Sequence, residues 1–248
     1  MPNRDPSLQL YTLRTLLEED VEGTLARVAE IGYTTVEPYG FVHRAERMSD
    51  ALTAHGLSAP TAHAPLLSDD RPTVYAAARR LGVRTLVVPI ADPARWQTRD
   101  GIESLAADLN QAAAEAADHG FTVGYHNHHF ELELKQDGVH ALEVLADHLA
   151  DDVVLEVDTY WAAVGGADVP ALLGRLGERV VALHVKDGDG TLNTKAQVAV
   201  GDGVLPVGEI LAAAPAQALR VVELDDFDGD ILDPVAKSLG FLSGLKEG

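Results

Sequence analysis

The chain has 248 residues, a formal net charge of −20 and no cysteine. The acidity argues against the basic face that nucleic-acid binding requires. The lack of cysteine excludes disulfides and thiolate chemistry and is compatible with a reducing cytosol. The hydrophobic content of 46% suffices for a sizeable core, and no apolar run approaches the length that spans a bilayer. We therefore expect a cytoplasmic protein without nucleic-acid or membrane partners.

The chain repeats one pattern, in which a helix-like stretch, often followed by a glycine, precedes a short β-rich run. The expected strands are residues 8–13, 33–37, 57–63, 83–90, 121–125, 153–158, 180–185 and 219–224. The expected helices are residues 20–31, 44–55, 73–81, 100–119, 139–149, 169–176, 208–214 and 234–245. In the first helix, Asp20 has the character of an N-cap and Gly32 that of a C-terminal cap.

Alternating strands and helices imply a parallel sheet with right-handed crossovers. Eight such units in 248 residues match the stoichiometry of a closed (β/α)8 barrel. The alternative is a doubly wound open sheet, which needs a glycine-rich phosphate loop after an early strand, and neither G-x-G-x-x-G nor G-x-x-x-x-G-K-[ST] occurs there. No linker or low-complexity tract divides the chain. The sequence therefore predicts a single (β/α)8 TIM barrel domain spanning residues 1–248.

Ionisable side chains, with a glutamine and a tryptophan among them, cluster where the expected strands end, whereas the strand bodies consist of Val, Leu, Ile and Ala. In a barrel these ends meet at one face. The residues concerned are Gln9, Tyr11 and Arg14, then Glu37 and His63, then His126, His128 and Glu131, and finally Asp158, Trp161, His184, Lys186, Asp187, Glu223 and Asp225. Burying charge is costly unless a partner or a metal compensates. Several strands with the same feature therefore indicate one common ligand.

Asp158, His184 and Glu223 follow three different strands and offer oxygen and nitrogen donors without thiolate, a set that suits Mn²⁺, Mg²⁺, Co²⁺ or Zn²⁺. His126 and His128 fall on the same face of the fifth strand, and either could be the fourth ligand. We predict one divalent metal ion held by His126, Asp158, His184 and Glu223. Taken singly, each residue also has a structural interpretation as a helix cap, an ion pair or a hydrogen-bonded histidine. For His63 the structural and functional interpretations stay equally open.

Several segments carry a family resemblance, in order along the whole chain. They are Leu-Gln-Leu-Tyr-Thr-Leu-Arg at 8–14, Gly-Tyr-x-x-Val-Glu at 32–37, Tyr-His-Asn-His-His-Phe-Glu at 125–131, Asp-Thr-Tyr-Trp at 158–161, His-Val-Lys-Asp at 184–187 and Val-Val-Glu-Leu-Asp at 221–225. The chain resembles the xylose isomerase-like TIM barrel superfamily, specifically the sugar phosphate isomerase/epimerase group that includes inosose dehydratase-like proteins.

The resemblance implies one divalent metal bound by Glu, Asp, His and Glu at the ends of four strands. Asp158, His184 and Glu223 correspond to the last three, whereas many members carry Glu where this chain has the His126 region. Ketose epimerases of the group show Asp-x-x-His after the sixth strand, and this chain has Trp161 in the place of that histidine. Endonuclease relatives have a basic DNA face, with which the charge of −20 disagrees.

A divalent ion that chelates a carbonyl and its neighbouring hydroxyl acidifies the carbon-bound hydrogen between them, and a nearby carboxylate or imidazole removes that proton. We assign proton transfer to His128, Glu131 and Glu223. We assign substrate contacts to Arg14, His63, Trp161 and Lys186. The predicted enzyme is an isomerase or epimerase acting on a monosaccharide, keto-sugar or inositol derivative.

Three functions other than isomerase or epimerase are also compatible with the sequence. They are a lyase on the same scaffold, which dehydrates an inosose or eliminates from a 3-keto-glycoside, a non-catalytic sugar-binding barrel and, more remotely, a nuclease. The expected partner is a small sugar or polyol, and a homo-oligomer is compatible with the sequence.

Overall fold

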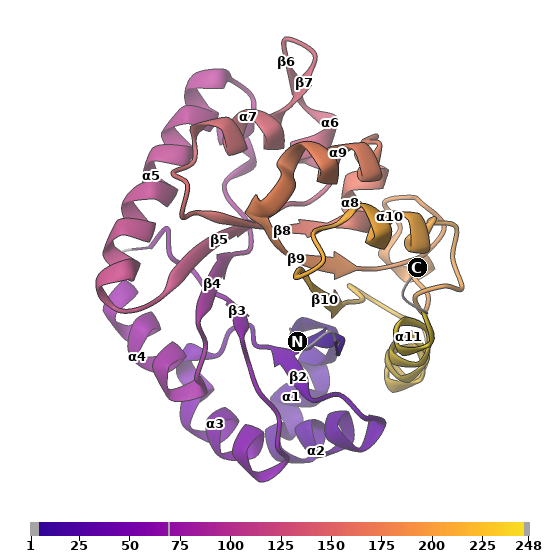
Figure 1. The fold of residues 1–248 in the computed structure, drawn as a ribbon. Coiled ribbons are helices and arrows are strands. Elements are labelled where there is room, and N and C mark those ends of the chain that lie inside the picture. Colours follow the sequence, from indigo (N-terminus) through magenta and orange to yellow (C-terminus); the bar gives the residue numbers. More distant parts are fainter. Residues whose placement is uncertain (1–4, 69, 246–248) are drawn as a thin grey trace.

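The sheet is an almost closed barrel (Figure 1). The structure, a computed structural model, describes residues 5–68 and 70–245. Eight parallel strands lie in the order β2–β1–β10–β9–β8–β5–β4–β3. Their bounds are β1 Ser7–Gln9, β2 Thr35–Glu37, β3 Thr61–His63, β4 Thr85–Val88, β5 Thr122–His126, β8 Val154–Asp158, β9 Val180–Val185 and β10 Leu219–Val222. The predicted (β/α)8 barrel is confirmed.

The barrel closes between β2 and β3 without a continuous ladder. Val36 donates its N–H to the Ser58 carbonyl at 2.9 Å, and Ser58 donates to the Thr34 carbonyl at 3.0 Å. Further along, the His63 N–H reaches the Pro38 carbonyl at 2.9 Å. Ser58, in the loop before β3, thus makes two of these three hydrogen bonds to β2 and its flanking residues, and β3 itself makes one. We call this junction between β2 and β3 the seam of the barrel.

Helices surround the strands in a ring (Figure 1). They are α1 Arg14–Glu19, α2 Val21–Ile31, α3 Ala45–Ala54, α4 Arg71–Leu81, α5 Arg99–Asp118, α6 Phe130–Glu133, α7 Ala141–His148, α8 Thr159–Val164, α9 Val169–Leu176, α10 Val207–Ala213 and α11 Leu232–Gly244. Five short 3₁₀ segments lie among them, at Leu10–Leu13, Val42–Arg44, Pro93–Trp96, Gly177–Arg179 and Thr194–Ala196. Within the described ranges, no helix is long and apolar enough to cross a membrane.

Local sequence explains where the helices begin, end and pack. Asp20 caps α2 by accepting the Gly23 N–H at 3.0 Å, and Gly32 ends this helix at a φ of 116°, where a side chain would be strained. Helix α5 buries an apolar face with helical spacing against the barrel. That face consists of Ile102, Leu105, Ala106, Leu109, Ala112, Ala113 and Ala116.

The structure adds elements to the eight expected units and shortens the first strand. β1 ends at Gln9, because the chain then turns into the 3₁₀ segment Leu10–Leu13 and α1. An antiparallel hairpin, β6 Lys135–Gln136 and β7 Val139–His140, projects from the ring at the top of Figure 1. Its two-residue turn has positive φ at Asp137 and Gly138, as tight hairpins require. The expected helix 139–149 therefore begins only at Ala141.

A long loop follows β9 at the carboxyl-terminal face, and one buried carboxylate organises it. Asp187 accepts backbone N–H groups from Gly188, Gly201, Gly203 and Leu205 at 2.9–3.2 Å. A Cβ at Gly203 would lie 2.1 Å from Asp187 Oδ1, so only glycine fits this approach. Asp187 therefore fixes the loop between β9 and α10.

Replacing Asp187 with alanine is expected to lower the free energy of unfolding by about 3 kcal/mol, because four backbone donors lose their charged acceptor. Urea denaturation measures this change. Asp202→Ala, at an exposed position in the same loop, is the matched control and is expected to unfold like the wild type. Equal stability of the two variants would contradict the role given to Asp187.

Candidate metal centre

Strand register brings the polar residues of neighbouring strands to the same level and the same side. Glu156 on β8 pairs with His126 on β5, and Asp158 pairs with His184 on β9. Gln9 on β1 pairs with Glu37 on β2. Residues paired in a parallel ladder project to the same face of the sheet. All six are buried, so the interior of the barrel at this end is lined by ionisable groups.

The outer cluster consists of His126, Asp158, His184 and Glu223. Each offers one ligand atom, and these atoms lie within 4.8 Å of one another. His184 Nδ1 lies 2.7 Å from Glu223 Oε2, and His126 Nε2 lies 3.9 Å from Asp158 Oδ2. The four residues come from or directly follow four different strands, β5, β8, β9 and β10. These are the four residues that the sequence predicts as metal ligands, and the structure brings them together.

Two local interactions orient Asp158 within the outer cluster. Its Oδ1 accepts the Trp161 N–H at 2.8 Å and so caps α8, which leaves Oδ2 for the cluster. The Asn127 side chain bonds the Asp158 backbone in both directions, accepting from its N–H at 3.1 Å and donating to its carbonyl at 3.3 Å. The ends of β5 and β8 are thereby held together.

The inner cluster consists of His63, His126, Glu156 and His184, whose ligand atoms also lie within 4.8 Å of one another. Three imidazoles approach Glu156 Oε2, with nitrogens at 2.7 Å for His63, 3.1 Å for His184 and 3.3 Å for His126. Glu37 borders this cluster, with its Oε1 2.8 Å from His184 Nε2. Because Glu156 precedes Asp158 by two residues on the same strand, the inner cluster lies deeper in the barrel.

The two clusters share His126 and His184 through opposite ring nitrogens. His184 directs Nδ1 to Glu223 and Nε2 to Glu37 and Glu156. His126 directs Nε2 to Asp158 and Nδ1 to Glu156. A carboxylate on one nitrogen of a histidine fixes the tautomer and leaves the other nitrogen for a metal. Glu37 therefore suits His184 for ligation in the outer cluster, whereas His126 Nδ1 lies 3.3 Å from Glu156 Oε2 and has no hydrogen-bond partner among the described residues.

Burial and neighbouring charges shift the titration of these groups in opposite directions. Burial raises the pKa of Asp158 to about 6, although Lys186 and His184 oppose this. Burial alone would raise the pKa of Glu156, but the imidazoles around it, with His184 first, hold that pKa well below its usual range. Burial would lower the pKa of His184, yet Glu156 and Glu223 raise it well above the ordinary value. Neighbouring charges thus outweigh burial for the pKa of Glu156 and of His184, whereas burial outweighs them for Asp158.

Lys186 brings a positive charge to the outer cluster. Its Nζ lies 2.7 Å from Glu223 Oε2, 3.0 Å from Asp158 Oδ2 and 2.9 Å from Asp225 Oδ2. The ammonium also lies 5.5 Å from the centre of the Trp161 ring. Lys186 therefore contacts two oxygens of the outer cluster, and Asp225 anchors it on the other side.

His128 and Glu131 lie beside the outer cluster. The His128 ring centre is 5.2 Å from that of His126, and its Nδ1 has no hydrogen-bond partner among the described residues. Burial, with Lys186 second, lowers the pKa of His128 to about 4, so this imidazole is neutral at pH 7. Glu131 is fully buried, and its oxygens accept the Tyr125 hydroxyl and the His128 N–H, each at 2.9 Å. Burial raises its pKa to about 7.

The residues predicted to contact substrate lie in three places. Arg14 begins α1, five residues beyond the end of β1, with its guanidinium carbon 4.5 Å from the Tyr11 ring centre. Trp161 is buried beside Lys186, and its Nε1 has no partner within the described part of the chain. His63 instead belongs to the inner cluster, bonded to Glu156 rather than open at the mouth.

Sequence reasoning missed Glu156. The run Val-Leu-Glu-Val reads as the body of a strand, and only its final Asp158 attracts attention as a strand-end residue. A signal was nevertheless present, because residues two apart on a strand face the same way. A glutamate two positions before a predicted ligand, in an otherwise apolar strand, shares the face of that ligand.

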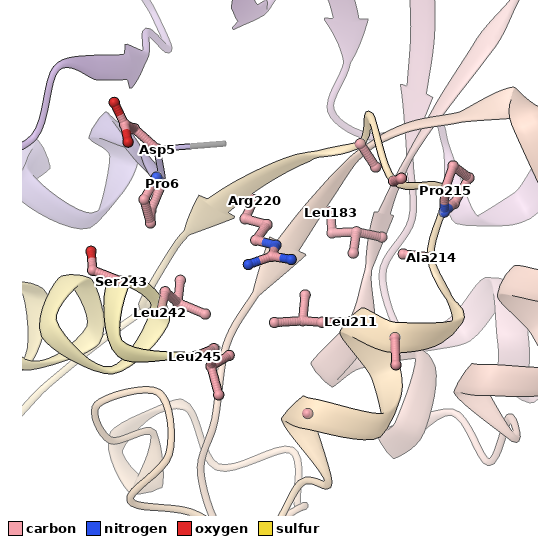
Figure 2. Close-up of a pocket in the computed structure, with 14 residues that line it drawn as sticks. Asp5, Pro6, Leu183, Leu211, Ala214, Pro215, Arg220, Leu242, Ser243 and Leu245 are labelled. Carbon is pink, nitrogen blue, oxygen red and sulfur yellow. The ribbon is translucent and has the colours of Figure 1, made fainter. Parts of the chain in front are cut away.

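A cavity of about 850 Å³ lies elsewhere, between the outer wall of the barrel and helices α10 and α11 (Figure 2). Leu183 and Arg220 line it from β9 and β10. Because His184 points into the barrel, its neighbour Leu183 points outward. This cavity is therefore separated from both clusters by the wall of the barrel.

Comparison with known proteins agrees with this architecture. The sequence model of the xylose isomerase-like TIM barrel family matches residues 25–220. The chain belongs to this family. A search of curated proteins found no match.

Several solved structures share this fold over most of the chain. A sugar phosphate isomerase/epimerase from Parabacteroides distasonis has a TM-score of 0.79 and 23% identity, covering 97% of this chain and 94% of that one. A probable 3-DHS dehydratase from Bacillus anthracis has a TM-score of 0.76 and 14% identity, with coverage of 98% and 100%. The IOLI protein with a bound zinc atom has a TM-score of 0.70 and 16% identity, with coverage of 96% and 95%. At these identities the likeness shows the fold.

The raised pKa of Glu131 predicts how stability depends on pH. The folded-state pKa of about 7 exceeds the ordinary value of 4.5, so the fold favours the protonated carboxyl. That contribution is complete below pH 4.5 and is lost as pH rises through 7. Between pH 5 and 8, the wild type is expected to lose about 3 kcal/mol of unfolding free energy relative to Glu131→Gln.

Chemical denaturation at a series of pH values measures this difference. Glu133→Gln removes an exposed carboxylate from the same helix and serves as the control. Parallel pH profiles for the wild type and Glu131→Gln would show that the Glu131 carboxyl titrates normally.

Proposed function

We propose that the protein is a divalent-metal-dependent sugar isomerase or epimerase acting on a monosaccharide, keto-sugar or inositol derivative in the cytoplasm. The observation that carries this proposal is the outer cluster, in which donors from His126, Asp158, His184 and Glu223 lie within 4.8 Å of one another. Membership in the xylose isomerase-like family and the isomerase, epimerase and zinc-containing neighbours support it.

The donor set of the outer cluster fits a divalent ion. Two imidazoles and two carboxylates suit Mn²⁺, Co²⁺ or Zn²⁺, and Mg²⁺ to a lesser degree. The side chains are buried, and carboxylates in such surroundings need a compensating cation. When bound, such an ion polarises a substrate carbonyl and makes the neighbouring carbon more acidic.

The protein would supply proton transfer and orientation. His128 is neutral at pH 7, has a free Nδ1 and lies next to the cluster, so it is our first choice for the group that removes the carbon-bound proton. Glu223 is the candidate for returning it from the other side. Glu131 holds the His128 backbone in place, and its pKa of about 7 suits proton exchange near neutral pH.

Charged and aromatic groups around the outer cluster would hold the substrate. Lys186 is suited to stabilising a developing negative charge on a substrate oxygen, because its ammonium is buried beside Asp158 and Glu223. Trp161 offers a ring face and an unpaired N–H. Arg14 would contact a distal hydroxyl or carbonyl. Because His63 bonds Glu156 in the inner cluster, we assign it a supporting role rather than direct substrate contact.

A lyase remains the second candidate, because loss of a β-hydroxyl from the same deprotonated substrate gives dehydration. The site residues are the same for both reactions. Proton NMR in D₂O with unphosphorylated keto-sugars and inososes separates them, since an epimerase or isomerase retains the hydroxyl and a lyase releases water. A non-catalytic sugar-binding barrel would bind the sugar without any solvent deuterium entering the α-carbon.

Two variants test the separate roles of ligand and base. Asp158→Asn is expected to lose metal, measured by elemental analysis, because it removes a charged ligand. His128→Gln is expected to retain metal while deuterium exchange slows about 10²- to 10⁴-fold, the usual contribution of a general base. Metal-free protein that turns over sugar at the full rate would refute the proposal, as would normal metal content and activity in Asp158→Asn.

Lys186→Met is expected to raise the affinity for Mn²⁺ roughly 10- to 100-fold, because the Lys186 ammonium lies next to two ligand oxygens and repels the Mn²⁺ ion. Turnover should fall in the same variant, since the stabilising ammonium is gone. Isothermal titration measures the affinity. Lys195→Met is the matched control, an exposed lysine in the loop after β9 whose partner Asp228 lies outside the cluster. Unchanged Mn²⁺ affinity in Lys186→Met would rule out this electrostatic coupling.

A further inference from the structure

Two arginines and two tyrosines lie in a row beyond the carboxyl ends of β1 and β2. The rings of Tyr11 and Tyr39 pack edge to face, with their centres 5.2 Å apart. The guanidinium carbon of Arg14 lies 4.5 Å from the Tyr11 ring centre, and that of Arg44 lies 5.7 Å from the Tyr39 ring centre. We call these four residues the arginine–tyrosine cluster. Two positive charges are thereby held against one aromatic pair.

The arginine–tyrosine cluster continues the polar end of the barrel. Gln9 ends β1 and Glu37 ends β2, and the two residues are paired in the ladder, with a hydrogen bond of 2.7 Å between their side chains. Tyr11 and Tyr39 each follow two residues later along the chain. Glu37 in turn lies 2.8 Å from His184 of the outer cluster. The arginine–tyrosine cluster therefore belongs to the same carboxyl-terminal face as the outer cluster, on its β1–β2 side.

Arg44 is a buried charge without a carboxylate. It is 8% exposed and is the one buried arginine among residues 5–68 and 70–245. Its Nε donates to His43 Nε2 at 3.2 Å, and its two terminal nitrogens have no hydrogen-bond partner in those ranges. Six other arginines of the same ranges do pair with a carboxylate, namely Arg27, Arg71, Arg80, Arg95, Arg99 and Arg175. A buried charge without a partner is costly, so Arg44 is suited to an anion from outside the chain.

Arg14 adds a second unpaired cation beside the same aromatic pair. Its Nη1 donates to the Tyr11 carbonyl at 3.2 Å, and it forms no ion pair within the described part of the chain. Burial raises the pKa of Tyr39, Arg44 and Arg14 oppose this, and the exposed Glu18 of α1 reinforces it. Both guanidinium groups thus act on one phenol. They stay without an ion pair although the chain has 39 acidic residues.

The donors of the arginine–tyrosine cluster favour a carboxylate over a phosphate. A guanidinium presents parallel N–H groups that match the two oxygens of a carboxylate. Phosphate sites commonly add backbone N–H groups at the start of a helix that follows a glycine-rich loop, whereas α1 has only six residues and no glycine directly before it. The net charge of −20 also repels a dianion more strongly than a monoanion.

We propose that the arginine–tyrosine cluster binds a carboxylate of the substrate, so that the substrate is a keto-sugar acid. Arg44 is the main ligand of this carboxylate, and Arg14 adds positive charge. The inference deepens the proposed function and rests on it, because the outer cluster is taken to hold the reacting carbonyl. The acidic end of the sugar then lies beside β1 and β2, and its carbonyl end lies towards the metal ligands of the outer cluster.

Three ketoses that differ only at carbon 6 test the proposal. D-Fructuronate carries a carboxylate there, D-fructose a hydroxymethyl group and D-fructose 6-phosphate a phosphate. Isothermal titration measures their affinity for the full-length protein in the presence of Mn²⁺. D-Fructuronate is expected to bind roughly 10- to 100-fold more tightly than D-fructose, the usual contribution of hydrogen bonds to a charged group. Bound Mn²⁺, counted by elemental analysis in the same samples, reports separately on the outer cluster.

Variants of the two arginines locate the carboxylate. Arg44→Met and Arg14→Met are expected to lose the preference for D-fructuronate and to bind D-fructose as the wild type does. Arg47→Met removes an exposed arginine of α3 and is the matched control, which should keep the preference. Circular dichroism of each variant confirms folding, and the partly exposed Arg14 provides a second variant if Arg44→Met does not fold.

Equal affinity for D-fructuronate and D-fructose, with Mn²⁺ bound, would overturn the carboxylate site and leave the proposed function intact. Tighter binding of D-fructose 6-phosphate than of D-fructuronate would overturn the assignment to a carboxylate, and so would a lack of binding by all three ketoses. A preference that persists in both arginine variants would overturn the role of the arginine–tyrosine cluster. A preference lost in these variants, in protein that binds no Mn²⁺, would support the carboxylate site and refute the metal-dependent function.

Discussion

Compensation of buried negative charge is the constraint on which the rest of this structure depends. Parallel strands that close into a barrel must end at a common face, and here that face carries carboxylates on β2 and β8 and just after β10. Removing such groups from water is unfavourable without nearby donors or cations. Each one accordingly has a neighbour from another strand, such as Gln9 for Glu37 or Lys186 for Glu223. The barrel is stable in this form only because distant segments of the chain supply these partners.

The periodic parts of the fold could be predicted from the sequence, because their signals are local. Helix α9 and strand β9 were expected with the bounds that the structure shows, and α2 differs by one residue. Short elements such as α1 and α8 were not predicted. Each has only six residues and directly follows a barrel strand or its 3₁₀ extension, so its hydrophobic pattern is too brief to stand out.

The outer cluster could be predicted for a similar reason, since Asp158, His184 and Glu223 each occupy the end of a recognisable strand. The inner cluster could not, because its central residue depends on register rather than on position in the sequence. Glu156 faces His126 only through the pairing of β5 with β8. The role of Lys186 likewise depends on Asp225, which comes from beyond the next strand. Contacts that depend on which strands are neighbours cannot be predicted from the sequence of one segment alone.

The outer cluster is linked to the surface loop after β9. Gln197 in that loop donates to Asp225 Oδ2 at 2.7 Å and accepts the Asp225 N–H at 2.7 Å. Asp225 in turn anchors the Lys186 ammonium. Since Asp187 fixes the same loop through four backbone N–H groups, the position of the lysine charge depends on a segment that also borders the mouth.

The seam of the barrel acquires a particular meaning from this arrangement. Glu37 and His63 belong to β2 and β3, the adjacent strands with the sparsest main-chain pairing, and their side chains approach to 3.4 Å inside the barrel. This side-chain contact joins β2 and β3 where the main-chain ladder between them is incomplete. The ionisable interior of the barrel therefore also contributes to closing its wall, because this side-chain contact adds to the few main-chain hydrogen bonds between β2 and the chain around β3.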